Sequence, residues 1–184
     1  MKNKIRWMIL TFLLLAGCAT PAPQTDVYFS PSKKCENGLI ELIDHANKSI
    51  DAAVYSINNK NIVNALKRAH KRGIKIRILT DRLQAAGKSS RVMELHDNGL
   101  NIRVHSKNKI EHNKFAIFDG LQATTGSYNW TTPATTKNSE NCVFFSDHPE
   151  VVTDYQKRFD YLWQINGKKA SDAWFEKQLS KESF

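Results

Sequence analysis

HNKFAIFDGLQATTGSYN, residues 112–129, combines two short apolar segments, a turn and several polar side chains at fixed spacing. Residues 112–118 and 122–126 have the composition of strands. Between them, Asp119-Gly120 is a strong signal for a tight turn. The stretch therefore predicts a β-hairpin that brings the two ends of the motif side by side.

Four polar side chains of this hairpin are expected to converge on one patch. His112 and Lys114 share a face of the first strand, because side chains i and i+2 point the same way. Ser127 and Asn129 follow the second strand at the same spacing. These groups can attack a phosphodiester without a metal. A neutral imidazole is the nucleophile, and the cation and the hydroxyl and amide groups bind the non-bridging oxygens as charge builds.

The pattern H-x-K-x₄-D-x₆-G-S-x-N occurs once, which bears directly on the chemistry. The leaving alkoxide needs a proton, and one histidine cannot both attack and protonate. His105-Ser106-Lys107 has the same opening but lacks the aspartate and the G-S-x-N, so we do not count it as a second copy. We expect His105 to be structural.

This motif resembles the signature of the phospholipase D superfamily. The resemblance implies a covalent phosphohistidine on His112 and a second histidine that protonates the leaving group. With one motif per chain, it implies a twofold homodimer in which two His112 side chains face each other across the axis. The similarity extends over residues 27–165 and is greatest to the compact exported bacterial endonucleases of the superfamily.

Two acidic residues complete the set of candidate catalytic residues. Glu140 resembles the family's acidic residue that holds the histidine ring by its other nitrogen; a solvated loop glutamate is the alternative. Asp119 belongs to the motif, but its place on the turn favours a structural role or a pairing with a basic group. We count both as candidates.

The flanking sequence predicts an α/β fold: a mixed, mostly β-α-β sheet flanked by helices on both faces. Strand-like and helix-like segments alternate before the hairpin, and strands follow in quick succession after it. The expected strands are 27–29, 51–57, 75–80, 102–105, 112–118, 122–126 and 141–146. The expected helices are 35–48, 60–72, 88–98, a long one from Pro149, and a short one near 172–180 in a polar tail, 166–184.

The N-terminal residues have the layout of an export signal. Residues 1–17 carry a basic start and a short apolar run, as a signal peptide does. Cys18 lies in a lipobox-like context, which favours lipidation over ordinary cleavage nearby, and residues 18–26 form a Pro-rich tether. We therefore expect an exported bacterial protein, periplasmic or anchored to the outer membrane by an N-terminal lipid.

The net charge, the cysteines and the histidines indicate which binding partners, disulfides and metals to expect. The net charge is +9 for the whole chain and 9 − 3 = +6 without the three bases of residues 1–17, which favours polyanions, either nucleic acid or anionic lipid headgroups. Cys35 and Cys142 could pair in an oxidising compartment, but Cys142 lies in an apolar strand and simple burial is the interpretation we favour. The histidines show no zinc or magnesium spacing, so we expect no metal and no cofactor.

Two further groups of residues have two interpretations each. The basic cluster on the second helix is either a solvated helix end or a track for phosphates; it comprises Lys67, Arg68, Lys71 and Arg72. Tyr128 and Trp130, which flank Asn129, either stack on a base or belong to the core.

Three functions follow, in order of preference. The first is a metal-independent, non-specific endonuclease that cleaves DNA, with RNA as a further candidate substrate. The second is a phospholipase D-type hydrolase of lipid headgroups, for which roughly 155 residues leave little room for an acyl-binding groove. The third is a non-catalytic nucleic-acid-binding component, which would not need His112 together with Glu140.

Overall fold

The computed structural model describes residues 22–182, which contain a seven-stranded sheet with the order β1-β7-β6-β5-β2-β3-β4. β2, β3 and β4 are parallel, and every other neighbouring pair is antiparallel. The strands are β1 (Gln24–Ser30), β2 (Ser49–Val54), β3 (Lys75–Thr80), β4 (Asn101–Val104), β5 (Lys114–Phe118), β6 (Gln122–Gly126) and β7 (Glu140–Ser146). The expected mixed sheet, parallel where β-α-β units occur, is confirmed.

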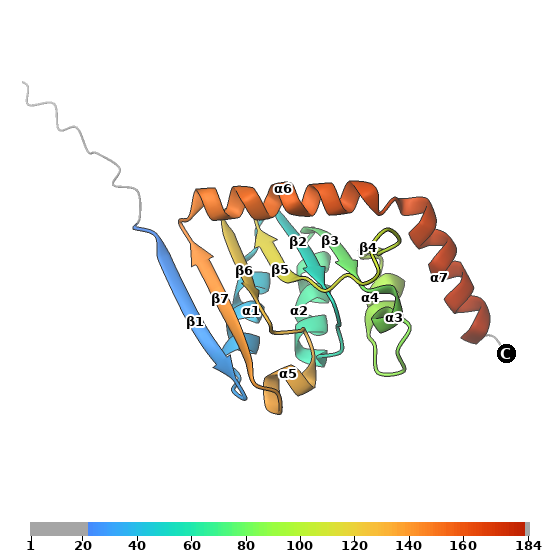
Figure 1. The fold of residues 1–184 in the computed structure, drawn as a ribbon, viewed down its shortest axis with the longest axis horizontal. Helices are drawn as coiled ribbons and strands as arrows, with labels where there is room; N and C mark the ends of the chain where they lie inside the picture. The colour runs from blue at the N-terminus through green and yellow to red at the C-terminus, as the bar shows by residue number, and fades with distance from the viewer. Residues whose placement is uncertain (1–21, 183–184) are drawn as a thin grey trace, which may run out of the picture.

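Helices cover both faces of the sheet, as the sequence predicted. They are α1 (Lys34–His45), α2 (Lys60–Lys71), α3 (Arg82–Ala85), α4 (Val92–Asp97), α5 (Thr132–Thr136), α6 (Pro149–Ile165) and α7 (Lys168–Glu182). α1 and α2 pack together on one face, and α6 runs across the strands on the other (Figure 1). α7 lies beside β4, at the edge of the sheet (Figure 1).

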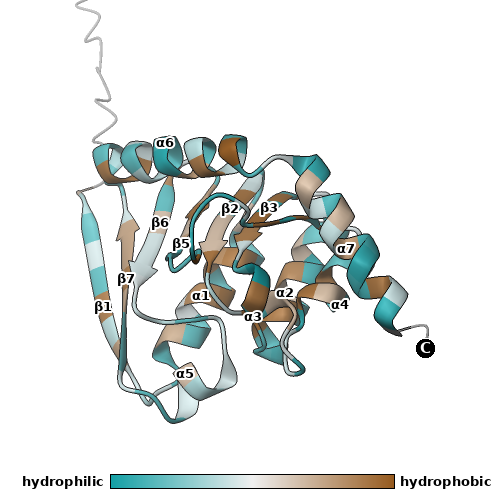
Figure 2. Ribbon diagram, turned by 45° about the vertical axis from the view of Figure 1, so that its right-hand side comes forward, coloured by the Kyte–Doolittle hydropathy of each residue, from teal (hydrophilic) through white to brown (hydrophobic). Residues whose placement is uncertain are grey.

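The alternation of side chains along β5 divides the core into two clusters. Phe115 and Ile117 pack beneath α6, whereas Ala116 and Phe118 face the cluster formed with α1 and α2. All four side chains are buried. β2 and β3 beside them are largely hydrophobic, and β1 at the edge is mostly polar (Figure 2). A strand buried on both faces therefore delivers the first half of the motif to one end of the sheet.

The ends of the domain differ from the sequence-based expectation. β1 begins at Gln24, inside the expected tether, because its backbone pairs with β7 over its whole length. α7 is longer than the short helix expected and is not merely a polar tail. Its Phe175 is buried and stacks on His96 with ring centroids 3.9 Å apart, and Ser171 Oγ accepts a hydrogen bond from Val104 N.

The structure also corrects the preferred interpretation of the cysteines. Cys35 and Cys142 form a disulfide that links α1 to β7. Both cysteines are buried, so burial and pairing occur together rather than as alternatives. The sequence could not decide this, because the pairing depends on where α1 packs against the sheet.

The expected signal peptide (1–17), the lipidation site Cys18 and residues 18–21 of the tether lie outside the described residues. Within residues 22–182, no helix is long and apolar enough to cross a membrane.

Candidate active site

His112 lies just before β5 rather than inside it, because β5 begins at Lys114. It is exposed, and its ring packs edge-on against Tyr55, with ring centroids 4.6 Å apart. Tyr55 N donates to Asn113 O at 2.8 Å, which fixes the segment beside the end of β2. The nucleophile candidate is therefore held by Tyr55, just beyond the end of β2, although it is not itself part of the sheet.

The side chain of Lys114 is positioned next to His112 by a hydrogen bond to the backbone of His112 and by the ring of Tyr55. Its Nζ donates to His112 O at 2.7 Å and lies 5.0 Å from the centroid of the Tyr55 ring. The expected closeness of His112 and Lys114 is confirmed, although the two residues do not share a strand face.

The electrostatic environment of Lys114 combines burial with two carboxylates. Burial lowers the pKa of the Lys114 ammonium below its ordinary value, and the carboxylates of Glu140 and Glu111 offset part of that effect. The protein thus removes part of the water around the Lys114 ammonium and partly compensates for it with the two carboxylates. A partly desolvated cation beside an imidazole is well suited to bind an anionic oxygen.

The second half of the motif forms a turn that only glycine permits. Gly126 has a φ of 145°, and a Cβ there would lie 2.3 Å from Asn141 O. The same carbonyl accepts hydrogen bonds from Ser127 N and Tyr128 N at 3.1 and 3.2 Å. Asn141 N in turn donates to Ser127 Oγ at 3.0 Å, so the G-S-x-N segment is fixed to the start of β7.

Glu140 lies at the centre of this second half, but it does not hold the histidine ring in this chain. Its Oε2 accepts a hydrogen bond from Ser127 Oγ at 2.5 Å, and its Oε1 accepts one from Asn138 Nδ2 at 2.9 Å. It also acts electrostatically on Lys114. Glu140 therefore connects the two halves of the motif through the serine and the lysine, and the expected His112–Glu140 hydrogen bond is absent among the described residues.

The residues that flank Asn129 belong to the core. Tyr128 and Trp130 are buried, and burial raises the pKa of the Tyr128 hydroxyl to about 12, where it is paired with Thr135 Oγ1 at 2.6 Å. These rings are not available for base stacking, which settles the alternative left open by the sequence. Asn129 Oδ1 between them is buried and has no hydrogen-bond partner among the described residues.

Asp119 does not belong to the site. It lies on the turn at the far end of β5 with a φ of 57°, roughly 15 Å from Lys114 at the usual rise per strand residue. Its carboxylate accepts backbone hydrogen bonds from Asn47, Lys48 and Ser49 at 2.7 to 2.9 Å. Asp119 thus fixes the connection between α1 and β2. Its assignment to the candidate catalytic residues was wrong, and the structural interpretation holds, with backbone N–H groups as partners.

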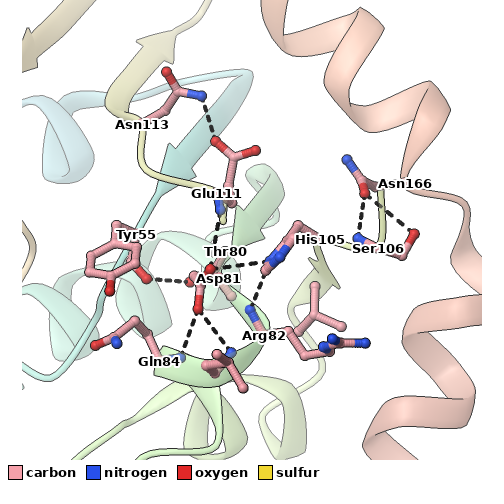
Figure 3. Close-up of polar contacts among 12 residues, drawn as sticks. Tyr55, Thr80, Asp81, Arg82, Gln84, His105, Ser106, Glu111, Asn113 and Asn166 are labelled. Carbon is pink, nitrogen blue, oxygen red and sulfur yellow. Dashed lines mark hydrogen bonds and ion pairs between the residues drawn. The ribbon is translucent and has the colours of Figure 1, made fainter. Parts of the chain in front are cut away.

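A buried polar network supports the segment that leads into His112 (Figure 3). Asp81 Oδ2 accepts from Glu111 N at 3.1 Å and lies 3.3 Å from His105 Nδ1. His105 Nδ1 accepts from Arg82 N at 3.0 Å, which confirms the structural role expected for this histidine. The network joins α3, the end of β4 and the start of the motif, so it fixes the backbone position of His112.

Glu111 is a residue that sequence reasoning missed. Its side chain is 1% exposed, and its Oε1 accepts a hydrogen bond from Asn113 Nδ2 at 2.5 Å. Its Oε2 is buried without a partner among the described residues. A buried carboxylate with an unpaired oxygen is costly, so its place directly before the nucleophile candidate is significant. Its adjacency to His112 was the only available signal.

The basic cluster on α2 is largely engaged in ion pairs with neighbouring helices. Arg68 makes a two-pronged contact with Asp44 of α1, and Lys67 Nζ contacts Glu94 of α4 at 3.0 Å. Arg72 donates to the carbonyls of Ile43 and Ala46. These contacts support the solvated helix-end interpretation over a phosphate track.

Two of the catalytic candidates line a cavity of about 470 Å³ between the hairpin and α6. His112, Lys114 and Phe115 line one side. Tyr155 and Arg158 of α6 line the other. Among residues 22–182, no group of three or more histidine, cysteine, aspartate or glutamate side chains could hold a metal ion.

Comparison with known proteins shows the family to which this chain belongs. Residues 39–163 match the family described as "Cardiolipin synthase, PLD-like domain". The chain is 32% identical over 161 residues to a mitochondrial cardiolipin hydrolase of Xenopus tropicalis, which covers 88% of this chain and 73% of that protein. The matched residues contain every candidate described above for the site.

Two solved structures share the fold over almost their whole length. One is a phospholipase D family member, Nuc from Salmonella typhimurium, with a TM-score of 0.75 and 31% identity, covering 79% of this chain and 97% of that one. The other is NucT from Helicobacter pylori, with a TM-score of 0.71 and 25% identity, covering 77% and 96%. The resemblance read from the motif therefore extends to the entire domain.

Proposed function

The chain belongs to the phospholipase D superfamily and is a phosphodiesterase of that group, and from this premise we propose that it is a metal-independent endonuclease. The substrate would be DNA, with RNA as a further candidate. The observation that carries the proposal is that His112, whose side chain is exposed, and Lys114, whose ammonium is partly desolvated, line one cavity and are linked by the hydrogen bond from Lys114 Nζ to His112 O.

The proposed reaction proceeds in two displacements at phosphorus. An imidazole nitrogen of His112 forms a bond to phosphorus, and the bond to the leaving oxygen breaks as that oxygen takes a proton from a second histidine. The second histidine then takes a proton from water, whose oxygen displaces His112 and regenerates it. Lys114 Nζ and Asn129 Nδ2 would donate to the non-bridging oxygens. Ser127 supports the site by holding Glu140.

The second histidine would come from another copy of the chain. Among the described residues, His105 is buried in the Asp81 network and cannot supply the proton at the cavity. A twofold dimer with two facing His112 side chains satisfies the need. Full activity of a protein that sedimentation shows to be monomeric at nanomolar concentration would exclude this arrangement.

Nucleic acid is favoured over lipid by size. The net charge without the three bases of residues 1–17, 9 − 3 = +6, suits a polyanion but does not separate nucleic acid from anionic lipid. The chain covers 97% and 96% of the compact structures of Nuc and NucT, and roughly 155 residues leave little room for an acyl-binding groove. The identity to a cardiolipin hydrolase favours the second candidate function, hydrolysis of phospholipid headgroups.

The decisive experiment is cleavage of plasmid and single-stranded DNA by the purified protein in excess EDTA. We expect full activity, and a loss on the order of 10³-fold or more in His112→Ala with unchanged thermal stability, because the side chain is exposed. His45→Ala, an exposed histidine on α1, is the control and should cleave normally. Cleavage of phosphatidylglycerol or cardiolipin vesicles without DNA cleavage would select the lipid function instead.

An exported location is supported by the disulfide between Cys35 and Cys142, because such bonds persist in oxidising compartments. We propose a periplasmic protein attached to the outer membrane through lipidated Cys18. Fractionation of cells that express the full chain tests both parts. Cys18→Ala should move the protein from the membrane to the soluble periplasmic fraction, and unchanged membrane association would exclude the lipid anchor.

A further inference from the structure

The cavity at the catalytic candidates is larger than one phosphate group requires. Its volume of about 470 Å³ lies in the range of small-molecule pockets, about 300–1,000 Å³. It extends from His112 and Lys114 on the hairpin to Val151 and Arg158 on α6. A substrate that places its reacting phosphate at His112 therefore has a neighbouring part that reaches α6.

Arg158 is the cation on the α6 side of this cavity, and it has no carboxylate partner among the described residues. Asp154, an exposed carboxylate that also lines the cavity, pairs with Lys157, with Nζ 3.5 Å from Oδ1. The Arg158 guanidinium lies over the ring of Tyr161, 5.5 Å from its centroid. This differs from Arg77 on β3, which contacts two carboxylates.

The wall between the two cations is aromatic. Phe115 and Tyr155 line the cavity with their ring centroids 4.9 Å apart and tilted by 45°. Such a surface accepts an uncharged sugar or glycerol portion, whereas a planar guanidinium that lacks a partner is suited to hold a phosphate by two hydrogen bonds. The cavity thus offers a place for an uncharged linker followed by an anion.

We propose that Arg158 binds a second phosphate of the substrate, the one adjacent to the phosphate attacked at His112. The inference rests on the proposed phosphodiesterase centre and defines its substrate class as a molecule with two neighbouring phosphodiesters. A polynucleotide has this chemistry in its successive backbone phosphates. A lipid with two phosphates joined by glycerol, such as cardiolipin, has it as well.

Two soluble substrates separate the role of Arg158 from catalysis itself. Bis(4-nitrophenyl) phosphate has one phosphodiester, and oligothymidylate has many. In Arg158→Ala we expect kcat/KM on oligothymidylate to fall about 10- to 100-fold, as for a lost charge-assisted hydrogen bond. The rate on bis(4-nitrophenyl) phosphate should stay within about twofold of the wild type. Lys71→Ala, an exposed cation on the opposite face of the sheet, is the control and should change neither rate.

The outcomes distinguish this proposal from the proposed function. Equal losses on both substrates, or no loss on oligothymidylate, overturn the role of Arg158 while leaving the endonuclease intact. If the wild type cleaves cardiolipin but not oligothymidylate, the endonuclease proposal fails. Arg158→Ala should then lose activity on cardiolipin vesicles and not on phosphatidylcholine vesicles, and equal activity on both would overturn the inference.

A binding measurement covers the case in which turnover is too slow to compare. Oligothymidylate binding to His112→Ala is measured against salt concentration, with and without Arg158→Ala. Removal of one phosphate contact should lower the slope of log K against log salt by about 0.7. An unchanged slope would contradict the proposed contact.

Discussion

The two ends of β5 carry parts of one sequence motif but have opposite physical states. At the start of the strand, His112 is exposed, and a buried oxygen of Glu111 has no partner among the described residues. At the end of the strand, both carboxylate oxygens of Asp119 accept backbone hydrogen bonds. The start of the strand thus presents the catalytic candidates His112 and Lys114, whereas the carboxylate at its end is used by the fold.

The difference also appears in the pKa values. Burial lowers the pKa of Lys114, which makes its charged form less stable until an anion arrives. Burial opposes ionisation of Asp119 as well, but three backbone N–H groups outweigh it and lower the pKa of that carboxyl. Hydrogen bonds from the protein thus stabilise the charged form of Asp119, whereas the charged form of Lys114 is only partly compensated for its burial.

The largest effect is expected at the catalytic end. Lys114→Gln should lower kcat by about 10²- to 10³-fold, because the cation that binds the phosphate oxygens is lost, while thermal stability changes little. Since the pKa of Lys114 is lowered, the wild-type activity should fall on the alkaline side at a pH below that of an ordinary lysine. Lys114→Arg should retain partial activity without this alkaline loss, and an identical pH profile would show that another group titrates.

At the structural end, Asp119→Asn should lower the free energy of unfolding by about 1–3 kcal/mol, because hydrogen bonds to a charged acceptor are lost. Catalysis should stay within about twofold of the wild type. The folded pKa is lowered, so this stabilisation is complete above the unfolded value of about 3.9 and disappears as the pH falls through the folded value. Denaturant titrations across acidic pH measure it.

Asp147 is the matched control for this substitution. It is exposed and has a φ of 58°, close to that of Asp119, and asparagine tolerates this conformation. Asp147→Asn should therefore leave stability almost unchanged. Equal destabilisation of both variants would mean that the backbone conformation matters rather than the three hydrogen bonds.

The smallest effect is expected at Glu111, whose carboxylate acts electrostatically on Lys114. Glu111 raises the pKa of Lys114, so Glu111→Gln should shift the alkaline limb of the activity profile to lower pH. The same substitution at Glu150, which is exposed at the start of α6, should not move the limb. A loss of activity that is equal at every pH would instead indicate a purely positional role for Glu111.

Local sequence patterns were sufficient to predict the bounds of an element where the contacts that define the element are between residues near in sequence. The bounds of β3 and β6 match the prediction, because apolar alternation and the adjoining turns define them. The placement of His112 outside β5 was missed, because the end of a strand depends on its partner, here β2 and Tyr55. For the same reason β1 begins earlier than expected.

The sequence by itself determined the fold class, the hairpin, and the closeness of His112 to Lys114, since residues two apart remain close in any strand-like backbone. Only the tertiary structure separated Asp119 from the site, paired the cysteines, placed Asp81 behind Glu111 and brought Arg158 to the cavity. Each of these contacts joins segments at least 30 residues apart, or depends on how a helix packs on the sheet. Sequence spacing carries no information about such distances, because they are set by which faces bury one another.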